Sequence, residues 1–154
     1  FSSIGTATAA SGEATHILSV QPKLTFNSIT NRVKFTLENL NILVTGTSPI
    51  RWDLCLGTTL TGTTTFIDAN TTYSGFQYNI LGTLSGTPAI TIASGYVASS
   101  GQTKGETNMS VPFKYPITLD AAGVARVNGR LTLLVTGIGG ASACRAVMNW
   151  KEIR

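Results

Sequence analysis

The residues that could catalyse a hydrolytic reaction are few in this chain. Nucleophilic hydrolysis needs a base beside a nucleophile, and the only histidine is His16, with Glu13 and Ser19 close to it in sequence. A catalytic triad is defined by the spatial geometry of its members, and residues so near one another along the chain seldom form one. His16 is therefore expected to lie at the surface or in a contact between subunits.

Hydrolysis of a glycoside would need two carboxylates about 5–10 Å apart. Most acidic residues of this chain fall at expected turns or at outward positions of expected strands. Asp53 shares the outward face of its strand with Arg51 and Cys55, and a cross-strand ion pair accounts for it. No catalytic residue is predicted, and the chain is expected not to be an enzyme. The seven acids are Glu13, Glu38, Asp53, Asp68, Glu106, Asp120 and Glu152.

Metal and phosphate sites are not predicted either. Cys55 and Cys144 are far apart in sequence, without a CxxC motif or a companion histidine. Two small half-buried thiols are the favoured interpretation, and a disulfide requires neighbouring strands. The GIGG segment at 137–140 precedes a strand, whereas a phosphate loop precedes a helix with a lysine. The segment IDANTT has one acid, too few for calcium. No cofactor is expected.

The composition predicts an all-β fold with an uncharged surface. Charged residues make up 12% of the 154 residues, against about 25% in ordinary domains. Threonine suits strands, and glycine and serine suit turns. The formal net charge is +4, but the cations are scattered, so nucleic-acid binding is not expected. No stretch is long and apolar enough to predict membrane insertion. A surface with so little charge offers little repulsion against self-association.

Alternation of apolar and polar residues places the strands. Near the C-terminus the pattern predicts a strand, a glycine-rich turn and a second strand paired as a hairpin. In that last strand Arg145 and Val147 point outward. Two apolar runs at 33–44 are out of phase, which predicts a bulge or a tight turn at Glu38–Asn39. Inward positions are Val33, Phe35, Leu37, Leu40, Ile42, Val44, Ile50, Trp52, Leu54, Leu56, Cys144, Ala146, Met148 and Trp150.

About eight short strands separated by turn residues favour an antiparallel β-sandwich of the jelly-roll kind. Residues 1–15 are small and polar and are interpreted as a linker or N-terminal arm, followed by one sandwich domain over 16–154. Pro112 and Pro116 confine MSVPFKYPITL to an edge strand or to pairing on one side. The motif VTG, followed by a turn and a strand with Arg and Trp, occurs at 44–46 and again at 135–137.

Aromatic residues in loop-rich stretches are the candidates for binding. Aromatic faces can stack on the apolar faces of sugar rings, and loops on a rigid scaffold often carry binding sites. The competing interpretation for each residue is packing in the core or against another subunit. The candidates are Tyr73, Phe76, Tyr78 and Tyr96, with the loops at 57–79 and 99–108.

The C-terminal part of the chain resembles a family. ITLDAAGVARVNGRLTLLVTGIGGASACRAVMNWKEIR, preceded by TLTGTTTFIDANTTYSGFQYNILGTLSG, resembles the C-terminal domain of tail-fibre, tail-spike or head-fibre proteins of tailed phages. The resemblance covers roughly residues 55–154. It implies a trimeric β-structure at the end of a fibre, located at the surface or tail of a virion.

Taken with the residues, the resemblance predicts a non-enzymatic virion domain. Its expected partners are two further copies of itself, other virion proteins, and a host surface glycan or protein. Trimers bury extra apolar faces around their axis, so Arg145 and Val147 are candidate subunit contacts. The alternatives are a capsid decoration or cement domain without a receptor, and a carbohydrate-binding module.

Overall fold

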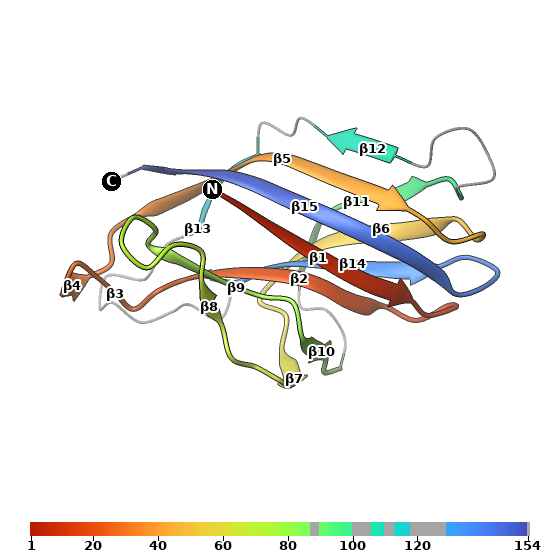
Figure 1. Cartoon of the computed structure of the whole chain (residues 1–154), viewed down its shortest axis with the longest axis horizontal. Coiled ribbons are helices and arrows are strands. Elements are labelled where there is room, and N and C mark those ends of the chain that lie inside the picture. Colours follow the sequence, from red (N-terminus) through yellow and green to blue (C-terminus); the bar gives the residue numbers. More distant parts are fainter. Residues whose placement is uncertain (87–89, 100–105, 110–112, 118–128, 154) are drawn as a thin grey trace.

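The fold is built from antiparallel sheets (Figure 1). The described residues contain no helix, and so none long and apolar enough to cross a membrane. The all-β prediction is confirmed, and the arrangement is consistent with a β-sandwich. The computed structural model describes the chain apart from residues 87–89, 100–105, 110–112, 118–128 and 154.

The first sheet has five strands, and its long central strands place most of the candidate interface residues. Its order is β1-β15-β5-β12, with β13 also paired to β5. The bounds are β1 (Ser2–Ala9), β5 (Lys34–Val44), β12 (Glu106–Met109), β13 (Phe113–Ile117) and β15 (Ser142–Ile153).

The second sheet has six strands in the order β11-β6-β14-β2-β9-β8. Its bounds are β2 (Thr15–Pro22), β6 (Ile50–Leu56), β8 (Ile67–Asp68), β9 (Phe76–Asn79), β11 (Ile90–Val97) and β14 (Leu131–Gly137). Two small hairpins form separate two-stranded sheets. The hairpins are β3 (Thr25–Phe26) with β4 (Ile29–Thr30), and β7 (Leu60–Gly62) with β10 (Gly82–Leu84).

The core lies between the two sheets and follows the alternation in the sequence. In β15 the side chains of Cys144, Ala146, Met148 and Trp150 are buried. Trp150 stacks on Phe35 of β5 with ring centroids 5.7 Å apart. Phe35 also contacts Phe76 of the second sheet at 5.3 Å. Burial of each such side chain stabilises the fold by about 1.5–3 kcal/mol, so these aromatics join the sheets at one end of the core.

A bulge links the two out-of-phase halves of β5. Asn149 of β15 pairs with Asn39, whereas the next residue, Trp150, pairs with Leu37. Glu38 is thus the extra residue that shifts the alternation by one position. The bulge predicted at Glu38–Asn39 is confirmed.

The predicted C-terminal hairpin is wrong. Strand β14 lies in the second sheet between β6 and β2, and β15 lies in the first sheet between β1 and β5. The GIGG segment therefore crosses from one sheet to the other. Period-two alternation shows which residues face the core, but it does not show which strand is the neighbour.

The two VTG motifs mark equivalent crossings at one end of the molecule. The first connects β5 of the first sheet to β6 of the second, and the other connects β14 to β15. The two crossings contact each other, since the amides of Thr45 and Gly46 both donate to the carbonyl of Ala143, at 2.9 and 3.0 Å. A Cβ on Gly46 would lie 2.6 Å from the nitrogen of Ala143, so glycine permits this approach.

The N-terminal segment differs from the flexible arm predicted for residues 1–15. Ser2–Ala9 pairs with β15 over its whole length as strand β1 (Figure 1). Its inward positions are the small residues Ser3, Gly5, Ala7 and Ala9, which hid its alternation. Gly5 lies directly over β2, where an added Cβ would be 2.2 Å from the carbonyl oxygen of Ile17.

The proline-containing segment contributes Met109 to the end of β12 and forms β13, and both strands pair with β5. This agrees with the prediction of a segment confined to the margin of a sheet. Pro112 and the loop at 99–108, apart from Ser99 and the backbone at 106–108, lie outside the described residues.

The second sheet is covered on both faces, which the sequence analysis did not predict. Asp53 and Cys55 were expected to face outward, but they are 5% and 0% exposed. They lie on the side away from the main core, where Thr132 and Leu134 of the neighbouring strand β14 are also fully buried. The β7–β10 hairpin packs against this sheet at β2. The segment expected to be a loop at 57–79 contains three short strands, β7, β8 and β9.

Candidate functional site

The candidate interface residues lie together on the outer face of the first sheet. Arg145 is paired on one side with Thr6 and on the other with Leu43. In the next row Val147 stands between Ile4 and Asn41. Directly opposed residues in a sheet share a face. We call the surface formed by Ile4, Thr6, Leu43, Arg145 and Val147 the β15 face.

The β15 face combines exposed apolar side chains with one cation. Ile4 is 60% exposed and Leu43 is 44% exposed. Arg145 is exposed between them, and the two ion pairs of the described residues, Lys23–Asp68 and Arg51–Asp53, lie elsewhere. An arginine within an apolar patch is typical of residues that anchor protein interfaces.

The candidate receptor-binding aromatics do not form one platform. Tyr73 and Tyr96 are 63% and 71% exposed and are available for stacking. Tyr96 lies on β11 and Tyr78 on β9, with β6, β14 and β2 between them in the sheet order. Tyr78 is half-buried.

The prediction of Phe76 as a receptor contact is wrong. Its side chain is 0% exposed and packs on Phe35 in the core. The strand preceding it is only two residues long, too short for an alternating pattern that would predict a sheet in this region. The competing interpretation, core packing, holds for Phe76.

His16 begins a buried chain of hydrogen bonds. Its Nε2 lies 2.9 Å from the hydroxyl of Ser19, and that hydroxyl lies 2.8 Å from Oγ1 of Thr132. His16 is 6% exposed, so the prediction of a surface histidine is wrong. Burial lowers its pKa from 6.5 to about 4, and the backbone of Gly82 offsets only part of that shift. At neutral pH the ring is uncharged.

The hydrogen-bonded group of His16, Ser19 and Thr132 contains the residue types of a nucleophile and a base, but its geometry gives it a structural role. Ser19 and Thr132 are both 0% exposed, so a substrate cannot reach either hydroxyl in this structure. The hydrogen bonds join β2 to β14, which are neighbouring strands. These hydrogen bonds therefore satisfy Nε2 of His16 and the hydroxyls of Ser19 and Thr132 on the outer side of the second sheet.

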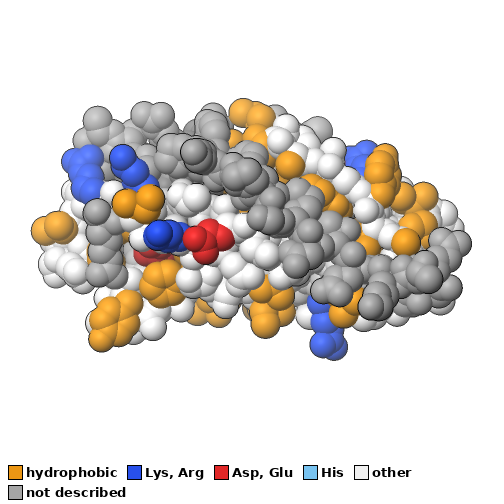
Figure 2. Space-filling view, turned by 90° about the horizontal axis from the view of Figure 1, so that it is seen from above, with side chains coloured by type: hydrophobic (Ala, Val, Ile, Leu, Met, Phe, Trp, Pro, Cys, Tyr) orange, Lys and Arg blue, Asp and Glu red, His pale blue; other side chains and the backbone are white. Residues whose placement is uncertain are grey.

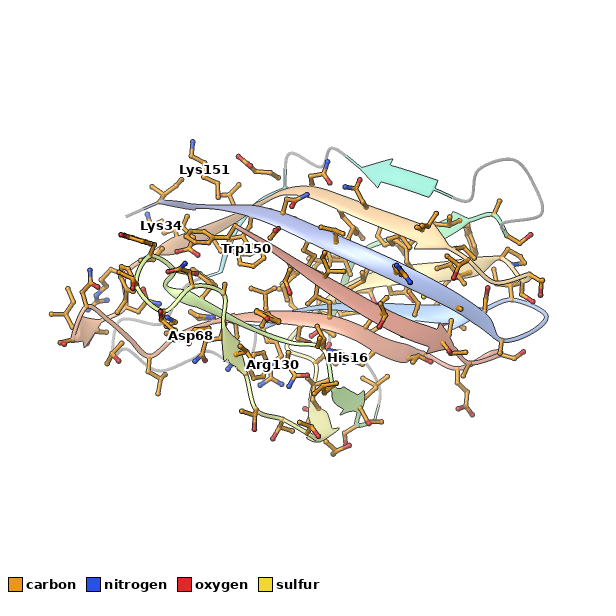
Figure 3. All side chains as sticks on the ribbon, viewed as in Figure 1. His16, Lys34, Asp68, Arg130, Trp150 and Lys151 are labelled. Carbon is orange, nitrogen blue, oxygen red and sulfur yellow. The ribbon has the colours of Figure 1, made fainter. Side chains whose placement is uncertain are left out.

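Arg130 lies close to His16 and contributes further contacts to this part of the second sheet (Figure 3). Its guanidinium stands 4.9 Å from the ring centroid of Phe66, a cation–π contact. It also donates to Oε1 of Gln21 and to the carbonyl of Thr58 at 3.0 Å. These contacts hold segment 58–66 against the sheet. Arg130 is one of the scattered cations of the sequence, and its contacts could not be predicted because its partners Gln21, Thr58 and Phe66 are distant along the chain.

The two cysteines are free and buried, and they lie in different sheets. The thiols are separate, as the favoured prediction has it, but they are fully buried and not half-buried. Burial raises the pKa of Cys144 to about 11 and also raises the pKa of Cys55. Among the described residues no group of three or more His, Cys, Asp and Glu side chains could hold a metal ion.

Comparisons with protein-family models, with curated protein sequences and with solved structures found no match to this chain.

Proposed function

We propose that this chain is a structural domain of a phage virion, at a fibre tip or on the capsid surface, which assembles as a trimer and attaches to the host surface. The phage assignment rests on the sequence resemblance at residues 55–154, and the antiparallel all-β fold agrees with it. The proposal includes a jelly-roll arrangement of the two sheets. Strands distant in sequence, such as β1 and β15, are neighbours, as such a winding requires.

The β15 face is the observation that carries the assembly part of the proposal. It exposes Ile4 and Leu43 around Arg145 on three neighbouring strands of the first sheet, β1, β15 and β5. The surface shown in Figure 2 likewise carries few charged side chains among many uncharged ones. Self-association buries such apolar side chains, and the low charge leaves little repulsion to oppose it.

Attachment to a host glycan or protein would use the exposed tyrosines. Tyr73 and Tyr96 can each stack on a sugar ring; Tyr73 lies in the turn between β8 and β9, and Tyr96 lies on β11 at the other end of the second sheet. A single tyrosine gives weak binding. Many copies on one virion would raise the overall avidity by several orders of magnitude.

A decoration or cement domain is the second candidate, and the same tyrosines favour it. Their separation gives no concentrated aromatic platform of the kind that a receptor or carbohydrate site would need. In this case the β15 face would contact other virion proteins, and the tyrosines would have no ligand.

The absolute mass of the chain in solution tests the assembly. Light scattering behind a sizing column should give three times 16.2 kDa. A monomer at micromolar concentration would contradict autonomous trimerisation. Binding to a glycan array, compared between the parent, Tyr73→Ala and Tyr96→Ala, then separates the two candidates. Loss of signal in either variant supports attachment, and no signal in the parent supports the decoration domain.

A further inference from the structure

Strand β1 ends the first sheet and is hydrogen-bonded along one side only. The amide of Trp150 donates to the carbonyl of Phe1 at 2.9 Å, and the amino group of Phe1 donates to the carbonyl of Trp150 at 2.8 Å. Hydrogen-bonded and non-hydrogen-bonded pairs alternate along an antiparallel ladder. The backbone groups of Ser3, Gly5, Ala7 and Ala9 therefore face β15, and those of Ser2, Ile4, Thr6 and Thr8 point away from the sheet.

This edge strand lacks the features by which proteins prevent an edge strand from pairing with another chain. Proteins protect edges with charged residues, prolines, bulges or very short strands. Ser2–Ala9 has no charge and no proline, and its register with β15 is regular throughout.

The other ends of the two main sheets are protected. Strand β8 has two residues, one of them Asp68. Strand β11 is interrupted by a bulge between Thr91 and Ala93. Strand β12 has four residues and begins at Glu106. Among the described edge strands, β1 is thus long and uncharged like β11, but has no bulge to interrupt it.

We propose that β1 pairs antiparallel with β1 of a second copy of this chain, so that two first sheets join into one. The register that uses every outward backbone group places Gly5 opposite Gly5. Ser2 then stands opposite Thr8, and Ile4 opposite Thr6. Each of these pairs exchanges two hydrogen bonds.

The side chains favour a second copy as the occupant. The pairing is symmetric, so any charge on β1 would meet a like charge across the two-fold axis, and β1 has none. Ile4, 60% exposed in one copy, becomes the diagonal neighbour of Ile4 in the other, within reach of an apolar contact. Ile4 and Thr6 are also β-branched, which suits a paired strand.

This contact is separate from the proposed trimer. A two-fold pairing of edges gives dimers or links two trimers, whereas contacts through the β15 face close a ring. A mass of three chains, together with fast hydrogen exchange of the outward β1 amides, would overturn the pairing and leave the proposed trimer standing. A mass of two chains with protected β1 amides would support the pairing and contradict the trimer.

Hydrogen exchange and two variants test the pairing in the full chain. In the assembled protein the amides of Ser2, Ile4, Thr6 and Thr8 should exchange at least about tenfold more slowly than in a sample diluted to single chains. Thr6→Pro removes an outward N–H while keeping the bonds to β15, and should weaken association about tenfold. Ile4→Lys should do the same through like-charge repulsion, and Thr6→Val and Ile4→Thr are the matched controls.

A cysteine pair tests the register. Opposed residues of a hydrogen-bonded pair have Cα atoms about 5.5 Å apart, a distance that a disulfide spans. The double variant Ile4→Cys with Thr6→Cys should therefore form a covalent dimer under mild oxidation, and the parent, whose cysteines are buried, should not. Fast exchange of the outward amides at high concentration, or no covalent dimer, would overturn the proposal.

Discussion

Glu152 and Ser74 join the C-terminal strand to the second sheet. The hydroxyl of Ser74 donates to Oε1 of Glu152, and the amide of Gly75 donates to Oε2 at 2.9 Å. Oε1 also accepts a hydrogen bond from the indole nitrogen of Trp150 at 3.0 Å. One carboxylate thus serves three donors from two parts of the fold, and Ser74 is fully buried.

Replacing that carboxylate should destabilise the protein. Glu152→Ala would leave the Trp150, Gly75 and Ser74 donors without their acceptor, and buried unsatisfied groups cost roughly 1–3 kcal/mol each. Water that enters the partly open site would reduce this loss, so we expect a loss of about 1–3 kcal/mol in the free energy of unfolding, measured in urea. Glu13→Ala, at an exposed position, is the control and should change little. Equal stability of the two variants would show that the Glu152 contacts contribute nothing.

The close approach of β1 to β2 makes a second prediction about stability. An alanine at position 5 would place its Cβ 2.2 Å from the carbonyl oxygen of Ile17, so one strand must move. Overpacking of this kind costs about 1–3 kcal/mol. Thermal unfolding should show a lower midpoint for Gly5→Ala than for the neighbouring exposed Thr6→Ala. A Gly5→Ala variant as stable as the parent would mean that the two strands separate at no cost.

Which residues are buried could largely be predicted from the sequence, and which strands are neighbours could not. The alternation in β15 and the bulge at Glu38 follow from local patterns, because a period of two and a change of phase are visible in the residues themselves. Pairing of β1 with β15 joins the two ends of the described chain. No local pattern encodes such a contact.

The candidate site could be predicted only in part, for the same reason. Alternation placed Arg145 and Val147 outward, but it could not show that Ile4 and Leu43 stand beside them, since this requires the register of three strands. The outward positions of β6 were misjudged because alternation distinguishes the two sides of a strand, and does not show that Asp53 and Cys55 are buried on the side away from the main core.

The cysteines should be unreactive while the chain is folded. Thiolate is the reactive form, and burial raises the pKa of Cys144 to about 11 and shifts that of Cys55 in the same direction. Labelling with a thiol reagent at pH 8 should therefore be slow in buffer and fast in denaturant. Rapid modification of either cysteine in the native protein would show that its strand opens, or that its surroundings are less buried than the structure shows.

Charge reversal on the β15 face tests the proposed assembly. Arg145→Glu places an acid among Ile4, Thr6 and Leu43 and should lower the assembled mass or raise the concentration needed for assembly by about tenfold or more. Lys151→Glu makes the same charge change on an exposed residue nearer the end of β15, away from the apolar cluster. Both variants should keep the thermal stability of the single chain. If the two variants assemble as the parent does, the β15 face is not the subunit contact.

The buried histidine should make the stability of the chain depend on pH. Its pKa is about 4 in the folded chain and near 6.5 when unfolded, so between these values the unfolded chain binds more protons. The contribution of His16 is therefore complete above about pH 6.5, and is lost as the pH falls towards 4. The difference between the folded and unfolded pKa values of His16 corresponds to roughly 3 kcal/mol in the free energy of unfolding.

The His16 contribution can be separated from that of the acids with a variant that cannot titrate. His16→Gln keeps a polar group opposite Ser19 and has no proton to gain in this range. Free energies of unfolding in urea at pH 7, 5.5 and 4.5 should fall more steeply for the parent than for the variant, because the carboxylates are common to both. Parallel pH profiles would show that the ring is protonated as readily in the folded chain as in the unfolded one. The hydrogen bonds from His16 through Ser19 to Thr132 would then have to accommodate the positive charge of the protonated ring.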